Sequence, residues 1–316
     1  MGRLERRNVV FVTTAFLLIA AVISSAQQPQ SATDNCLRRS IPLTVMRRSQ
    51  QPPEEPKSLQ VLVNGNQVSV VSSTPYTGPL RVLLLIDTSA SMKPLRGTTE
   101  WGLALPTAAF AMDAVPLTAA VAVGKFAERL QLSQWQDRDS ARDQVLSLKY
   151  QSPKGTTALY SAVNEASSVF RGVQFADTIF LVTDGGENHN NISLRHTVEN
   201  LVARGIRVFV FLVVPLEPYK TPEEQNGPLE MEDLANLTGG ALVKFPWSKE
   251  RLSSGEAAAA VKQIREQVAS PYRVDFQLTS PLNKEAKLKL EAPIDPKLYT
   301  FAYPRRMEPC TTAPPQ

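Results

Sequence analysis

Asp87, Ser89 and Ser91 are the residues of this 316-residue chain whose types and spacing most readily support chemistry. They follow a short, uninterrupted apolar run at 82–86, which is typical of a strand buried on both faces of a parallel sheet. At alternate positions of an extended loop, their side chains project to the same side. One carboxylate and two hydroxyls are hard oxygen donors suited to Mg²⁺, Mn²⁺ or Ca²⁺. The alternative is that both serines cap the next helix and that the Asp87 carboxylate accepts backbone N–H groups.

Two later segments carry patterns that complement this loop. Residues 154–162 read Lys-Gly-Thr-Thr-Ala-Leu-Tyr-Ser-Ala, and residues 180–186 read Phe-Leu-Val-Thr-Asp-Gly-Gly. Together with Asp-x-Ser-x-Ser after an apolar strand, they resemble the metal-ion-dependent adhesion site, or MIDAS, of von Willebrand factor A domains and integrin inserted domains. The resemblance implies that Thr157 and Asp184 complete the ligand set. Thr156 stands where the family has a second glycine.

The resemblance also implies a cofactor and a mode of binding. The implied ligands of the ion are Asp87, Ser89, Ser91, Thr157 and Asp184. The expected ion is Mg²⁺, with Mn²⁺ or Ca²⁺ as alternatives, and one coordination position is left for an Asp or Glu of a protein partner. The resemblance covers about residues 80–250. Further matches at 184–188, 234–240 and 270–274 resemble a bacterial exported branch of the family that is called VWFA-related.

The elements that must position these residues alternate between strand and helix. Besides 82–86, apolar runs predict strands at 119–126, 178–182 and 208–214. Helical stretches are expected at 102–114, 138–148, 158–170, 193–204, 229–237 and 249–268. Strands separated by helices favour parallel pairing with right-handed crossovers. We therefore expect an α/β fold with a doubly wound, mostly parallel sheet flanked by helices. Ligand sites of such sheets lie at the carboxyl ends of the strands, where Asp87 is placed.

The flanks of this region predict a small β unit assembled from both ends of the chain. Asn64-Gly65 between two β-rich runs predicts a hairpin within 58–79, and alternating segments predict strands within 271–306. These patterns together predict the order of segments along the chain. It is a signal peptide at 1–26, a linker at 27–57, the hairpin at 58–79, the von Willebrand factor A domain at 80–270, the C-terminal strands at 271–306 and a loose tail at 307–316.

The N-terminus has the layout of a secretory signal peptide. Arg3, Arg6 and Arg7 precede an uncharged apolar run at 9–23, and small residues lead up to a cleavage site after Ala26. The apolar run is shorter than the roughly 20 residues that a membrane-spanning helix needs. We therefore expect a secreted, periplasmic or cell-envelope protein. Contact with a membrane is expected only if the segment is retained as an anchor.

Cleavage changes the meaning of the charge. The full chain has a formal net charge of +4, and 31 basic against 29 acidic residues, or +2, remain after residue 26. The sequence contains no basic stripe interleaved with aromatic residues, so we exclude nucleic acid as a partner.

The cysteines and histidines support no further metal site. Cys36 and Cys310, one near each end of the mature chain, can form a disulfide in an oxidising compartment, and the alternative is two unpaired thiols in loose tails. His189 and His196 match no zinc spacing with these cysteines and are expected at the surface.

Three classes of function follow from these patterns. The first is a non-enzymatic module that recognises a protein partner through the divalent cation at the MIDAS. The second is a structural envelope protein whose metal only stabilises the fold. The third is a Mg²⁺-dependent phosphotransferase of the haloacid dehalogenase type, which needs a second carboxylate two residues after the first as general acid. That position is Ser89 here, so we expect no enzyme.

Overall fold

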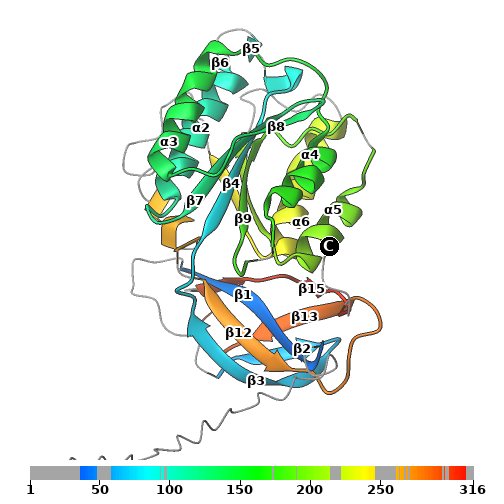
Figure 1. The fold of residues 1–316 in the computed structure, drawn as a ribbon. Coiled ribbons are helices and arrows are strands. Elements are labelled where there is room, and N and C mark those ends of the chain that lie inside the picture. The colour runs from blue at the N-terminus through cyan, green and yellow to red at the C-terminus, as the bar shows by residue number, and fades with distance from the viewer. Residues whose placement is uncertain are drawn as a thin grey trace, which may run out of the picture. The chain divides into compact units, whose positions relative to one another are not determined.

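The computed structural model describes most of the chain between Cys36 and Cys310 (Figure 1). The described residues are 36–47, 58–92, 94–95, 98–172, 174–189, 191–213, 222–245, 261–262, 264–266, 268–269, 271–293, 295 and 299–310. The expected signal peptide at 1–26, much of the helix expected at 249–268 and the end of the tail lie outside these residues.

A six-stranded sheet forms the centre of the α/β region, in the order β11-β10-β9-β4-β7-β8 (Figure 1). Its strands are β4 (Arg81–Asp87), β7 (Ala120–Phe126), β8 (Leu130–Leu132), β9 (Thr178–Thr183), β10 (Arg207–Val213) and β11 (Leu242–Phe245). All neighbouring pairs are parallel except β7 and β8, which form an antiparallel hairpin at one edge. The expected doubly wound, mostly parallel sheet is therefore confirmed.

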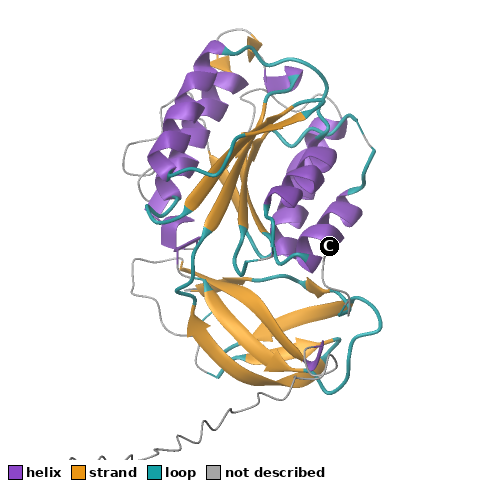
Figure 2. Cartoon of the chain, viewed as in Figure 1, coloured by secondary structure: helices purple, strands orange, loops and turns teal. Residues whose placement is uncertain are grey.

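Helices cover both faces of this sheet (Figure 2). They are α2 (Glu100–Ala114), α3 (Arg138–Ser147), α4 (Leu159–Ala166), α5 (Leu194–Ala203) and α6 (Pro222–Thr238). Strand β4 shows why its apolar run is continuous. Val82, Leu84 and Ile86 pack in the cluster that contains α2 and α3, whereas Leu83 and Leu85 pack in the cluster that contains α4, α5 and α6. A strand covered on both sides has no polar face.

Shorter elements complete the α/β region. Three 3-10 helices lie at Ala90–Met92 (η1), Leu148–Tyr150 (η2) and Ser167–Val169 (η3), and β5 (Pro94–Leu95) pairs with β6 (Thr98–Thr99). In the stretch expected as the last helix, Ile264 and Val268 are helical and buried in the cluster of α2 and α3.

The flanks form a second sheet of seven strands, with the order β14-β1-β12-β3-β2-β13-β15 and antiparallel pairing throughout. Its strands are β1 (Arg38–Arg47), β2 (Gln60–Val63), β3 (Asn66–Pro75), β12 (Tyr272–Gln277), β13 (Ala286–Glu291), β14 (Tyr299–Ala302) and β15 (Arg306–Met307). Asn64 and Gly65 both have positive φ angles, 50° and 84°, which suit the tight hairpin turn between β2 and β3. Alternate residues of β13 are buried, so this sheet has one core face.

Two sequence expectations about the flanks need correction. The expected linker at 27–57 contains the ten-residue strand β1, which pairs with β12 and β14. The expected loose tail begins instead with strand β15, and Cys310 is joined to Cys36 by a disulfide. Both elements depend on partners far away in the sequence. The other domain boundaries remain predictions.

The β unit contacts the α/β region at the edge opposite to the carboxyl ends of the strands. Arg207 is the first residue of β10 and is fully buried, and its guanidinium donates to the hydroxyl of Thr44 in β1 at 3.1 Å. Near the end of α6, Arg305 N–H donates to the carbonyl of Leu237 at 3.1 Å. Among the described residues, no helix has the length and hydropathy to cross a membrane.

Candidate metal-binding site

Two carboxylates meet at the carboxyl edge of the central sheet. Asp87 is the last residue of β4, and Asp184 directly follows β9, the parallel neighbour of β4. Asp87 is fully buried. Burial, and after it the negative charge of Asp184, raise the pKa of the Asp87 carboxyl to about 7, against the lowering effect of hydrogen bonds from Ser89 and Thr183.

Hydrogen bonds fix the orientation of the Asp87 carboxylate. Its Oδ1 accepts the backbone N–H of Ser89 at 2.9 Å, and its Oδ2 accepts the hydroxyl of Thr183 at 2.8 Å. The Thr183 hydroxyl accepts in turn from the N–H of Gly185 at 3.0 Å. The Asp87 carboxylate therefore joins the end of β4 to the end of β9.

The two serines lie beside this carboxylate. The hydroxyls of Ser89 and Ser91 are 3.0 Å apart, with Ser89 buried and Ser91 exposed. The next helix along the chain is the short 3-10 helix η1 (Ala90–Met92), so Ser89 directly precedes it and Ser91 lies within it. The hydrogen bond from Ser89 N–H to Asp87 belongs to the capping alternative, and the Ser89 hydroxyl also hydrogen-bonds Asp87 and lies next to the Ser91 hydroxyl.

Thr157 reaches the same edge through its backbone. The carbonyl of Gly155 accepts the N–H of Ala90 at 2.9 Å, which joins the Thr157 loop to the serine loop. The N–H of Thr157 donates to Asn188 Oδ1 at 2.7 Å, which joins it to the loop that starts at Asp184. The three segments that were singled out in the sequence are therefore adjacent in space. Thr157 itself is buried.

Two residues that sequence reasoning missed support this arrangement. Glu187 is buried, and its carboxylate accepts the N–H of Tyr160 at 3.0 Å and the N–H of His189 at 2.7 Å. Ala158, the residue before α4, provides no side-chain cap, so Glu187 takes that role at the start of the helix. Asn188 holds Thr157 in place, as described above. No local pattern marks either residue, because both act across about thirty positions of sequence.

The donor set fits a hard divalent cation. Two carboxylates and three hydroxyls supply oxygen atoms only, which suits Mg²⁺, Mn²⁺ or Ca²⁺. Within the described part of the chain, no group of three or more His, Cys, Asp or Glu side chains is placed to hold a metal. Any cation at this edge would therefore depend on the Ser and Thr hydroxyls. One oxygen of the Asp184 carboxylate, Oδ1, accepts the N–H of Gly186 at 3.0 Å.

Comparison with known proteins places the α/β region in a family. The model of the von Willebrand factor type A domain matches residues 82–245, which are 164 of the 316 residues. No curated protein matches the chain.

Solved structures of similar fold share little sequence with this chain. An aerotolerance-related membrane protein from Bacteroides fragilis, with multiple mutations to serines, is 20% identical with a TM-score of 0.42, over 60% of this chain and 98% of that one. A von Willebrand factor type A protein from Catenulispora acidiphila is 12% identical with a TM-score of 0.44, over 88% of this chain and 75% of that one. The manganese-loaded TRAP protein from Plasmodium vivax is 17% identical with a TM-score of 0.41, over 74% of this chain and 97% of that one. Because the family match spans more than half of the residues, this chain belongs to the von Willebrand factor type A domain family.

Proposed function

We propose that this protein is an exported, non-enzymatic binding module that holds a divalent cation, with Mg²⁺ preferred, and recognises an acidic residue of a protein partner. The proposed ligands are Asp87, Ser89, Ser91, Thr157 and Asp184. The observation that carries the proposal is the buried Asp87 carboxylate beside Asp184, with the paired hydroxyls of Ser89 and Ser91 next to it. Two like charges side by side, one of them fully buried, are unfavourable, and a dication between them would reverse the sign of that interaction.

The exposure of the site supports recognition over a purely structural role for the metal. Asp87, Ser89 and Thr157 are buried, whereas Ser91 is exposed and Asp184 is partly exposed. The donor set is therefore closed on the protein side and open on the other side. A bound ion would supply a Lewis-acid position that a carboxylate of a partner can complete.

Secretion is supported by the cysteine pair as well as by the N-terminal pattern. Cys36 and Cys310 form a disulfide that joins the two ends of the β unit. Disulfides of this kind persist in oxidising compartments such as the periplasm or the extracellular space. We therefore propose that the mature chain begins after the signal peptide and acts outside the cytoplasm.

An enzymatic role has less support. A phosphotransferase that uses Asp87 as nucleophile needs a general acid two residues later. Ser89 occupies that position, and its hydroxyl lies 3.0 Å from that of Ser91. A hydroxyl cannot replace the missing carboxylic acid, so the geometry favours binding over phosphoryl transfer.

The proposal is tested by capturing partners from an envelope extract on the immobilised mature chain, in Mg²⁺ and in chelator. We expect proteins that are retained in Mg²⁺, released by chelator, and not retained by Ser91→Ala. Ser91 is exposed, so this variant should keep the fold, which a thermal melt in chelator checks. Asp233→Asn, an exposed position of α6, is the matched control and should retain the same proteins. The proposal would be contradicted if the same proteins were retained in chelator as in Mg²⁺, and on Ser91→Ala as on the wild type.

A further inference from the structure

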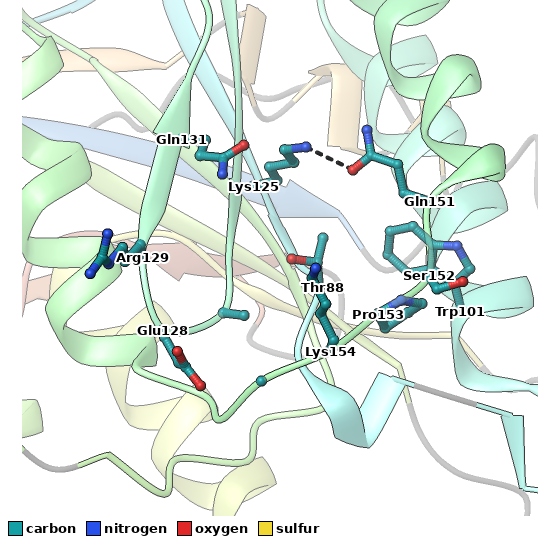
Figure 3. A pocket seen from close by; sticks show the side chains of 12 residues that line it. Thr88, Trp101, Lys125, Glu128, Arg129, Gln131, Gln151, Ser152, Pro153 and Lys154 are labelled. Atoms are coloured by element: carbon teal, nitrogen blue, oxygen red, sulfur yellow. Dashed lines mark hydrogen bonds between the residues drawn. The ribbon is translucent and has the colours of Figure 1, made fainter.

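A pocket of about 520 Å³ lies beside the candidate metal site, between the β7–β8 hairpin and the loop that follows η2 (Figure 3). Thr88 and Gly155 contribute to its wall. Thr88 stands between Asp87 and Ser89 in the chain, and Gly155 stands two residues before Thr157. The pocket and the metal site therefore share the same two loops.

The two loops are joined by backbone hydrogen bonds along this shared wall. Lys154 N–H donates to the carbonyl of Thr88 at 2.9 Å. The hydroxyl of Thr88 donates to the carbonyl of Phe126, the last residue of β7, at 2.8 Å. A ligand group in the pocket would thus sit against a wall whose position is fixed relative to the proposed metal ligands.

The pocket is rich in cationic side chains. Lys125, Arg129 and Lys154 line it, and Glu128 is the single carboxylate among the described residues of the lining (Figure 3). Lys125 Nζ donates to Gln151 Oε1 at 2.7 Å, so it is held by an amide and not by an acid. Within the described part of the chain, neither Arg129 nor Lys154 has a carboxylate at ion-pair distance.

Glu128 is turned toward the backbone of the Thr157 loop. Glu128 Oε1 accepts the N–H of Thr156 at 3.4 Å, and a Cβ added to Gly155 would lie 3.2 Å from the same oxygen. This placement leaves the three cations as the dominant charge of the pocket. The buried ring of Trp101 forms a further part of the lining.

We propose that this pocket is a second recognition subsite, which binds a second acidic side chain of the same protein partner whose first acidic residue completes the metal site. The inference rests on the proposed function and narrows it: the partner presents two acidic residues close together, not one. Arg129 and Lys154 supply the charge, and the amide groups of Gln131 and Gln151 supply further hydrogen-bond donors. An apolar residue at the second position would leave these donors without an acceptor.

The test is a selection of random twelve-residue peptides, displayed on phage, on the immobilised mature chain in Mg²⁺. We expect the peptides from the wild-type chain to share two acidic positions. Peptides from the Arg129→Gln/Lys154→Gln variant should keep one acidic position, and this variant should still bind Mg²⁺. Lys284→Gln/Lys287→Gln, which changes two exposed lysines at and before β13 in the other sheet, is the charge-matched control and should select the same peptides as the wild type.

Binding of a synthetic copy of the selected peptide then gives a magnitude. Loss of charge-assisted hydrogen bonds to one carboxylate should weaken binding to the double variant by about tenfold or more. Metal-dependent peptides with a single acidic position, or equal affinity for the wild type and the double variant, would overturn the subsite but leave the proposed function standing. Selection of no Mg²⁺-dependent peptide would overturn both.

Discussion

Asp87→Asn is expected to stabilise the metal-free protein at alkaline pH, although it removes a proposed ligand. The folded chain holds the Asp87 proton more tightly than the unfolded chain does, because burial and Asp184 raise the pKa of this carboxyl from 3.8 to about 7. The contribution of this group to stability is therefore complete below 3.8 and is lost as the pH rises through about 7. A neutral amide at this position does not ionise, so the variant does not lose this stability as the pH rises.

The size of the effect follows from the change in pKa. Raising the pKa of one buried carboxyl from 3.8 to about 7 corresponds to about 4 kcal/mol of lost stability at pH 8.5. The amide nitrogen cannot accept the hydroxyl proton of Thr183, as Asp87 Oδ2 does, and this costs about 1 kcal/mol. The net gain of the variant is therefore about 3 kcal/mol, or about 6–12 °C in melting temperature for a domain of this size.

The assay is thermal unfolding of the wild type and Asp87→Asn in chelator, at pH 5 and pH 8.5. The variant should melt higher than the wild type at pH 8.5, and the difference should shrink at pH 5. Added Mg²⁺ should raise the melting temperature of the wild type at pH 8.5, since binding to the native state adds stability by mass action. The melting temperature of the variant should stay nearly unchanged. Asp233→Asn, at an exposed position, should follow the wild type throughout. A difference between wild type and Asp87→Asn that does not depend on pH would refute this reasoning.

Three further variants test the supports of the site and of the β unit. Gly185→Ala should lower the free energy of unfolding by about 1–3 kcal/mol, because Gly185 has φ of 87° and a Cβ there would lie 3.0 Å from the carbonyl carbon of Gly227. Gly172→Ala, with φ of 64° and open space around it, should lower the free energy of unfolding by less, and urea titrations of both variants measure the difference. Glu187→Ala should cost about 1–2 kcal/mol and weaken Mg²⁺ binding, because α4 loses its cap, whereas Glu232→Ala on α6 should do neither. Cys36→Ser/Cys310→Ser should cost about 2–4 kcal/mol, and reductant should lower the stability of the wild type but not of this variant.

Much of the α/β fold was predictable because its signals are local. The strand β4 and the turn at Asn64-Gly65 can each be predicted from a few neighbouring residues. Strand β1 is the opposite case. It contains Pro42 and several arginines, and it becomes a strand because β12 and β14, more than two hundred residues later, pair with its two edges. Local sequence patterns do not reveal pairing with strands that are so distant in the chain, so β1 could not be predicted from them.

The site divides in the same way. Asp87 and Asp184 each end or follow a buried strand, so their meeting at one sheet edge follows from the expected topology. Glu187 and Asn188 are ordinary loop residues in sequence, and only the folded chain brings them to Tyr160 and Thr157. The pocket beside the site combines Arg129 with Lys154, which lie on different loops. Its charge is a property of the folded surface and not of any one segment.

The most direct test of the central claim is an isothermal titration of Mg²⁺ into the chelator-treated mature chain at pH 8. We predict one bound ion per chain, loss of that binding in Thr157→Val and in Asp184→Ala, and normal binding in the control Asp233→Asn, at an exposed position of α6. Thr157→Val keeps the shape of a buried side chain while it removes one proposed ligand oxygen. The absence of any bound ion, or unchanged binding in both ligand variants, would contradict the account.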